Sequence, residues 1–205
     1  IVVLVGGRPL SVNWIAQNVQ ALVQAWEPGS LGGRALANIL AGKVNPSAKL
    51  PISIPRHSGQ IQMIYNHKPS QYFHKYIDGP STPLYPFGFG LSYTRFAHTR
   101  ISDKDSFTAS IELTNVGDRE GTEVVQLYIR DIYSSATRPV KELKDFARVT
   151  LKPGEKKTVT FTVTPDKLAY WNRNMQYGVE KGEFEIMIGS SSQDKDLKKV
   201  KMEVL

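Results

Sequence analysis

The chain has 205 residues, 40% of them hydrophobic, and it contains no cysteine. This composition favours a packed globular protein and excludes disulfides, thiolate metal sites and a cysteine nucleophile. The net charge of +7 is diffuse, with no run that interleaves basic and aromatic residues, so nucleic-acid binding is not expected. No apolar run is long enough to cross a membrane, so membrane binding is not expected either.

The chain opens on a continuous apolar run, residues 1–5, rich in β-branched side chains. Such a run is typical of a parallel strand that is covered on both faces. No methionine, leader or helix cap precedes it, and a natural chain rarely begins inside a core strand. We therefore expect a piece of a longer polypeptide whose preceding part supplies the neighbouring strands.

A helix is predicted next. Apolar residues recur at helical spacing from Trp14 to Trp26. Ser11 or Asn13 is available as its N-cap, and the Pro28-Gly29 pair should end it.

A second helix is expected over residues 33–41, with Gly42 after its last turn. A short strand is expected over residues 49–54. Strand, helix, helix and strand make an α/β pattern with too few strands for a complete sheet. Residues 1–58 are therefore interpreted as an α/β remnant.

Residues 59–94 form a connector rich in proline and aromatic residues, with no period of its own. A flexible linker would be rich in glycine and serine and would lack aromatic anchors. We expect this connector to be ordered by its rings, which are Tyr65, Tyr72, Phe73, Tyr76, Tyr85, Phe87, Phe89 and Tyr93.

Residues 95–205 are predicted to form an all-β sandwich of the immunoglobulin or fibronectin III-like kind, with about seven strands. The strands seen in the pattern cover residues 107–113, 124–129, 146–151, 158–163, 182–189 and 200–205. Period-2 spacing points seven side chains inward: Val125, Leu127, Ile129, Val159, Phe161, Phe184 and Ile186. The acidic residues of the sandwich are expected to be solvated.

Several short motifs, in this order, together resemble glycoside hydrolase family 3. They are Gly7-Arg-Pro-Leu10, Ala25-Trp-Glu-Pro-Gly29, Asn45-Pro-Ser-Ala-Lys-Leu-Pro51, Tyr65-Asn-His-Lys-Pro69, Pro83-Leu-Tyr-Pro-Phe-Gly-Phe-Gly-Leu-Ser-Tyr-Thr94, Asn115-Val-Gly117, Arg138-Pro-Val-Lys-Glu-Leu143, Leu151-Lys-Pro-Gly-Glu155, Leu168-Ala-Tyr-Trp-Asn172 and Gly182–Gly189. The resemblance implies the C-terminal part of an α/β sandwich domain over 1–58, an inter-domain connector over 59–94 and a fibronectin type III-like domain over 95–205.

The resemblance also implies a function. The family's enzymes are retaining, exo-acting β-glycosidases that act on oligosaccharides, and the similarity favours a β-glucosidase of the bacterial periplasm or a secreted one. A β-xylosidase is the other specificity it suggests. In the family the nucleophile lies in an upstream (β/α)8 barrel and the acid/base glutamate lies in the preceding part of the α/β domain. These regions would be this chain's partners, and a homodimer is possible.

The residues agree that no catalytic pair is present. Within residues 1–94 the carboxylates are Glu27, read as a surface or helix-end residue, and Asp78, read as a turn former. The isolated chain is therefore expected to be inactive and structural, with no cofactor.

The four histidines show no metal-ligand spacing, so no metal is expected. Two connector residues, Tyr65 and His67, are the candidate contacts to sugar at a leaving-group subsite, and structural packing or hydrogen bonding is the alternative. The Gly29–Gly33 segment could bind phosphate, but close helix packing explains it better.

A second class of function also fits the β-rich half: a stand-alone carbohydrate-binding or adhesion module. Such a module should begin at a surface and not inside a sheet. An intact small α/β enzyme is disfavoured because neither a complete sheet nor a nucleophile with a base is visible.

Overall fold

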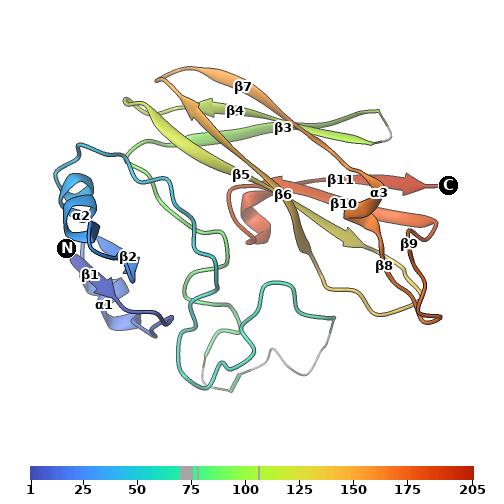
Figure 1. The fold of residues 1–205 in the computed structure, drawn as a ribbon, viewed down its shortest axis with the longest axis horizontal. Coiled ribbons are helices and arrows are strands. Elements are labelled where there is room, and N and C mark those ends of the chain that lie inside the picture. Colours follow the sequence, from blue (N-terminus) through green and yellow to red (C-terminus); the bar gives the residue numbers. More distant parts are fainter. Residues whose placement is uncertain (70–75, 78, 106) are drawn as a thin grey trace.

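The computed structural model describes residues 1–69, 76–77, 79–105 and 107–205. A small α/β unit (blue in Figure 1) lies beside a β-sandwich, and the connector (cyan to green) crosses between them. The predicted anchors Tyr72 and Phe73, the predicted turn former Asp78 and one of the four histidines, His74, lie outside the described residues. The predicted fold, an α/β remnant followed by a fibronectin III-like sandwich, is confirmed.

The α/β unit is built on two parallel strands, β1 (Val2–Val5) and β2 (Leu22–Trp26). Val2 lies opposite Leu22 in the register, and a bulge follows Leu4. Helix α1 (Asn13–Asn18) joins the strands, and α2 (Gly32–Leu40) follows β2. Gly42, at φ +70°, ends α2 as predicted.

The prediction of a single helix from Trp14 to Trp26 is wrong. Helix α1 ends at Asn18, and residues 22–26 pair with β1 instead. A short apolar run fits a helix face and a strand equally well, and here pairing with β1 decides between them. The predicted caps are also wrong: the N-cap residue is Val12, and the Asn13 side chain donates to the Arg56 carbonyl at 2.7 Å.

The α/β unit is open within this chain. Gly32 is the one buried residue among residues 1–52, and Ile1 and Trp14 are 71% and 72% exposed. The first strand was predicted to be covered on both faces, and within this chain it is not. The sheet has only two strands, and α1 has no buried residue, so these elements cannot cover both faces of β1.

The connector folds back on residues 50–54 without forming a strand. The Leu50 N–H donates to Phe89, and the Ile54 N–H donates to Tyr85, at 2.8 Å each. Among these contacts, only the one between Ile54 and Tyr85 forms an antiparallel β-bridge, and it is isolated from any strand. The predicted strand over 49–54 is therefore wrong, because Pro51 and Pro55 have no N–H to continue a ladder.

The sandwich contains two sheets with strand orders β11-β10-β5-β6 and β3-β4-β7. Their bounds are β3 (Phe96–Asp105), β4 (Thr108–Asn115), β5 (Gly121–Asp131), β6 (Glu142–Leu151), β7 (Lys156–Thr162), β10 (Gly182–Gly189) and β11 (Leu197–Val204). A short helix α3 (Pro165–Leu168), a hairpin of β8 (Tyr170–Trp171) and β9 (Tyr177–Gly178), and a 3-10 turn, η1 (Asp194–Asp196), complete the chain. All seven residues predicted to point inward are buried in one core.

Strand β3 was not found in the sequence pattern because it is irregular. Phe96 and Ile101 both contact the core, although their odd spacing would place them on opposite faces of a regular strand. A register shift between Thr99 and Ile101 returns them to one face. The pairing with β4 runs from Phe96 opposite Asn115 to Asp105 opposite Thr108, with a second register shift between Asp103 and Asp105.

A second, smaller core lies on the outer face of the four-stranded sheet. Tyr128 on β5 and Met187 on β10 are fully buried there, together with Leu197. The connector covers them with Tyr65 and Phe87, whose rings stack at 4.1 Å. Within the described part of the connector, Tyr65 and Phe87 are therefore fixed by contact with the sandwich, as predicted for these two rings.

Candidate functional site

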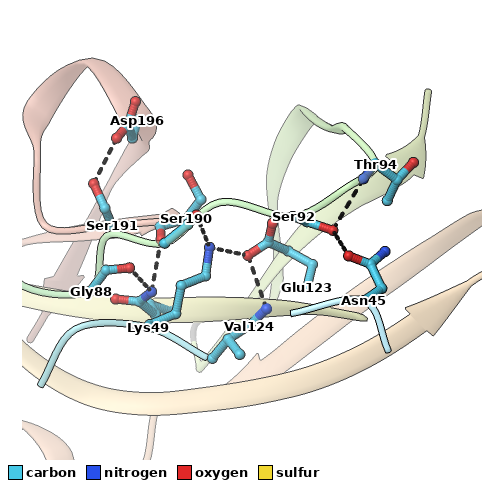
Figure 2. Close-up of polar contacts among 12 residues, drawn as sticks. Asn45, Lys49, Gly88, Ser92, Thr94, Glu123, Val124, Ser190, Ser191 and Asp196 are labelled. Atoms are coloured by element: carbon cyan, nitrogen blue, oxygen red, sulfur yellow. Dashed lines mark hydrogen bonds and ion pairs between the residues drawn. The ribbon is translucent and has the colours of Figure 1, made fainter. Parts of the chain in front are cut away.

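The first 94 residues meet the sandwich at a polar interface, the docking layer. A cleft also lies between the two parts. The docking layer comprises Asn45, Lys49, Gly88, Ser92, Thr94, Asn115, Glu123 and Gln126 (Figure 2, which labels all but two of these residues). The docking layer holds the connector against the sandwich.

The centre of the docking layer is an ion pair between Lys49 and Glu123, with Nζ and the carboxylate oxygen 2.7 Å apart. The Glu123 side chain is only 8% exposed. Burial raises the pKa of Glu123, and the Lys49 charge opposes that rise. The expectation that the acids of the sandwich are all solvated is therefore wrong at Glu123, because its partner comes from residues 1–58.

An asparagine network continues the layer, and Figure 2 shows the part of it formed by Asn45, Ser92 and Thr94. The side-chain oxygen of Asn45 (Oδ1) accepts hydrogen bonds from the Ser92 hydroxyl and the Tyr93 backbone N–H, at 2.9 and 2.8 Å. The fully buried Asn115 accepts from the Thr94 hydroxyl at 2.7 Å and donates to the Leu151 carbonyl at 2.9 Å. The sequence indicated only a turn at Asn115, whereas the structure makes it the link between connector and sandwich.

Gln126 and Gly88 form the third contact. The Gln126 amide donates to the carbonyls of Gly88 and Ser190, at 3.1 and 2.8 Å. Gly88 has φ +78°, and a Cβ there would lie 2.1 Å from the Gln126 side-chain oxygen. Both the backbone conformation and the close approach therefore require glycine at this point.

The pKa of His98 on β3 is affected by the charge of Lys49 in the docking layer. Burial, and then the positive charge of Lys49, lowers the pKa of His98 to about 4, with Asp196 acting in the opposite direction and Lys198 adding to the decrease. Its Nε2 atom is buried and has no hydrogen-bond partner among the described residues. The imidazole is therefore held neutral.

This predicts a pH dependence of stability. The folded-state pKa of about 4 lies below the ordinary value of 6.5, so the stabilisation is present above pH 6.5 and is lost as the pH falls toward 4. We expect the His98→Leu variant to lose less free energy of unfolding than the natural chain between pH 7 and pH 5. Urea denaturation at each pH measures this, and two parallel pH curves would contradict it.

The cleft lies between the connector and the outer face of the four-stranded sheet and has a volume of about 700 Å³. The side opposite the sandwich is lined by Arg56 of the α/β unit and by Tyr65, His67, Tyr85 and Phe89 of the connector. The sandwich side contributes Arg130, Lys141, Glu185, Met187, Asp194, Lys195 and Lys199. Its size is in the range of small-molecule sites.

The two candidate sugar contacts, Tyr65 and His67, both line this cleft. The Tyr65 ring also packs edge-on against Tyr128, and its hydroxyl accepts the Leu143 N–H at 3.2 Å. The carbonyl of His67 accepts the Val140 N–H at 2.9 Å. Both residues therefore hold the connector against the sandwich, and a contact with sugar stays a prediction.

The remaining candidates have structural surroundings. Glu27 is exposed after β2, and not at a helix end as predicted, and its carboxylate lies against Gly7. Gly32 packs on Pro28, where a Cβ would come within 2.5 Å, which supports helix packing for the Gly29–Gly33 segment.

Two other features are absent from the part of the chain that the structure describes. No three histidine, aspartate or glutamate residues in that part gather closely enough to hold a metal ion. No helix in it is both long and apolar enough to cross a membrane.

Comparison with protein families supports the assignment of both units. Residues 1–93 match the glycosyl hydrolase family 3 C-terminal domain, and residues 123–192 match the fibronectin type III-like domain. Among curated proteins, the chain is 44% identical to a periplasmic beta-glucosidase of Salmonella typhimurium, over 94% of this chain and 27% of that protein. It is 45% identical to a beta-xylosidase of Formosa agariphila, over 100% of this chain and 30% of that protein.

Solved structures agree. A beta-glucosidase of Listeria innocua in complex with glucose superposes with a TM-score of 0.90 at 37% identity, over 98% of this chain and 30% of that one. A b-glucosidase of Erythrobacter marinus gives a TM-score of 0.93 at 42% identity, over 99% and 28%. The chain thus spans less than a third of the length of these relatives.

Proposed function

Because the chain belongs to glycoside hydrolase family 3, we propose that the polypeptide containing it is a retaining, exo-acting β-glycosidase that removes terminal β-linked sugars from oligosaccharides. β-Glucosidase is the first candidate activity. β-Xylosidase is the second, favoured by the beta-xylosidase that is 45% identical over the whole chain.

One observation carries this proposal: similarity to glycosidases extends through both units and the connector. Curated relatives named as beta-glucosidases or probable beta-glucosidases match 92% or more of the chain, and a stand-alone sandwich module would share only the second unit. The alternative of a carbohydrate-binding or adhesion module is therefore kept only as an outcome of the test.

We propose a structural role for this chain within the enzyme. A retaining glycosidase uses two carboxyl groups about 5 Å apart. Glu27 is the one acidic residue described within residues 1–94, and it stands alone on the surface. The nucleophile and the acid/base are therefore proposed to come from the preceding barrel and the preceding part of the α/β domain, which would also cover the exposed faces of β1 and α1.

Further assignments belong to the same proposal. The division into 1–58, 59–94 and 95–205 follows the change from α/β unit to connector to sandwich. Tyr65 and His67 are proposed to contact the leaving-group sugar, since both line the cleft. A periplasmic or secreted location is suggested by the relative named as periplasmic, and a homodimer is proposed as the assembly.

The test compares the whole polypeptide with the 205-residue chain. We expect the whole polypeptide to release nitrophenol from an aryl β-glucoside faster than from an aryl β-xyloside, with retained configuration at the anomeric carbon by NMR. The 205-residue chain should show no turnover, because it lacks both carboxylates.

Two outcomes would contradict the proposal. Turnover by the isolated chain that Glu27→Gln abolishes would place the chemistry in this segment. Sugar binding without turnover by the whole polypeptide would favour the binding-module alternative. A faster rate on the aryl β-xyloside would exchange the two candidate activities.

A further inference from the structure

We infer that the cleft between the connector and the sandwich binds an acidic sugar, a pyranose that carries a carboxylate, with the carboxylate against the sandwich wall and the ring against the connector wall. The sugar part of this inference rests on the proposed function, whereas the preference for a carboxylate rests on the charge of the cleft.

The sandwich wall of the cleft is basic. Four cationic side chains line the cleft from this wall, those of Arg130, Lys141, Lys195 and Lys199, and a fifth, that of Arg56, lines it from the opposite side. Two carboxylates face them, those of Glu185 and Asp194. The described lining therefore carries a formal charge of +3, the difference between five and two.

The two carboxylates are occupied by lysines. Asp194 lies 2.8 Å from Lys141 and 3.4 Å from Lys199, and Glu185 lies 3.4 Å from Lys199. Among the residues described, Arg130 and Lys195 have neither an ion pair nor a side-chain hydrogen bond. They are the donors left for a ligand carboxylate, and a guanidinium matches the two oxygens of a carboxylate.

The opposite wall is aromatic. Tyr85 and Phe89 lie 5.2 Å apart with their planes 22° from parallel, and both line the cleft. Their antiparallel contacts with residues 50–54 fix their backbone. Such rings offer a flat apolar surface to the C–H face of a pyranose.

A neutral sugar would use only one wall of this cleft, and a bare inorganic anion would use only the other. A carboxylated pyranose satisfies both at once, and a volume of about 700 Å³ admits a disaccharide. The ligand class thus follows from the juxtaposition of Arg130 and Lys195 with Tyr85 and Phe89.

The test is calorimetric titration of the whole polypeptide with the thio-linked, hydrolysis-resistant analogues of glucuronosyl-β-1,4-glucose and cellobiose, and with inorganic sulfate. At low ionic strength the acidic disaccharide should bind about tenfold tighter than cellobiose, the gain expected from a charge-assisted hydrogen bond. Salt should weaken the binding of the acidic disaccharide and leave cellobiose unchanged. The Arg130→Gln and Lys195→Gln variants should each reduce the preference.

Arg173→Gln is the matched control, since this exposed arginine lies on the turn of the β8–β9 hairpin and does not line the cleft. The preference should survive in it. Equal binding of the two disaccharides, or a preference that neither Arg130→Gln nor Lys195→Gln changes, would overturn the inference. Sulfate binding as tight as that of the acidic disaccharide would also overturn it. None of these readouts needs turnover, so failure of the proposed activity would be seen separately.

Discussion

Replacing Phe161 with alanine should lower the free energy of unfolding by about 3–5 kcal/mol, the usual cost of a large cavity in a core. Phe161 lies on β7 and is 4% exposed, within the main core of the sandwich. Its direct neighbour across the sheet is Ala109 on β4. This small residue cannot fill the space that the phenyl ring would leave.

Urea denaturation followed by far-UV circular dichroism measures this loss. Phe146→Ala is the matched control, because that ring on β6 is 59% exposed and its truncation should change stability by less than about 0.5 kcal/mol. If Phe161→Ala proved as mild as Phe146→Ala, the sandwich core would not be packed as described. A truncated chain of residues 93–205 should still unfold cooperatively, because the main core lies wholly within it.

Replacing Lys49 with methionine should lower the free energy of unfolding by about 3 kcal/mol, because the buried Glu123 carboxylate would lose its partner. Glu123 is held inside the docking layer, where burial already raises its pKa. The double variant Lys49→Met/Glu123→Leu should regain most of the loss, since it leaves no unpaired charge behind.

The matched control is Lys201→Met. Lys201 pairs with Glu183 at a nitrogen–oxygen distance of 2.8 Å, close to the 2.7 Å of the Lys49–Glu123 pair, but the Lys201 side chain is 69% exposed. Solvent screens an exposed pair, so Lys201→Met should change the free energy of unfolding far less than Lys49→Met does. A double variant as unstable as Lys49→Met alone would contradict the idea that the unpaired carboxylate is the cause.

The sequence by itself determined the sandwich. Val125, Leu127 and Ile129 alternate with other residues along β5, and Phe184 and Ile186 do the same on β10. In a strand this period can serve only one buried face, so the inward residues follow directly from it. The order of the motifs was also enough to indicate the family, and the lack of a paired carboxylate was visible in the composition of residues 1–94.

Tertiary pairing decided what local patterns left ambiguous. The apolar residues between Trp14 and Trp26 suit a helix or a strand, and only the alignment of residues 22–26 along β1 settles the outcome. The register shift in β3 is likewise invisible in a period-2 pattern, because one extra residue reverses the faces that follow it.

Contacts between distant segments decided the candidate site. Tyr128 and Met187 occupy outward positions of their strands, yet both are fully buried because Tyr65 and Phe87 of the connector cover them. In the sequence Glu123 cannot be told apart from a solvated surface acid. It is buried where the remote segment of Lys49 packs on the sandwich, and the Lys49 Nζ atom lies 2.7 Å from its carboxylate. Periodicity reports which face of a strand is apolar. It carries no information about which remote segment lies on the other face, and that segment places the docking layer and the cleft.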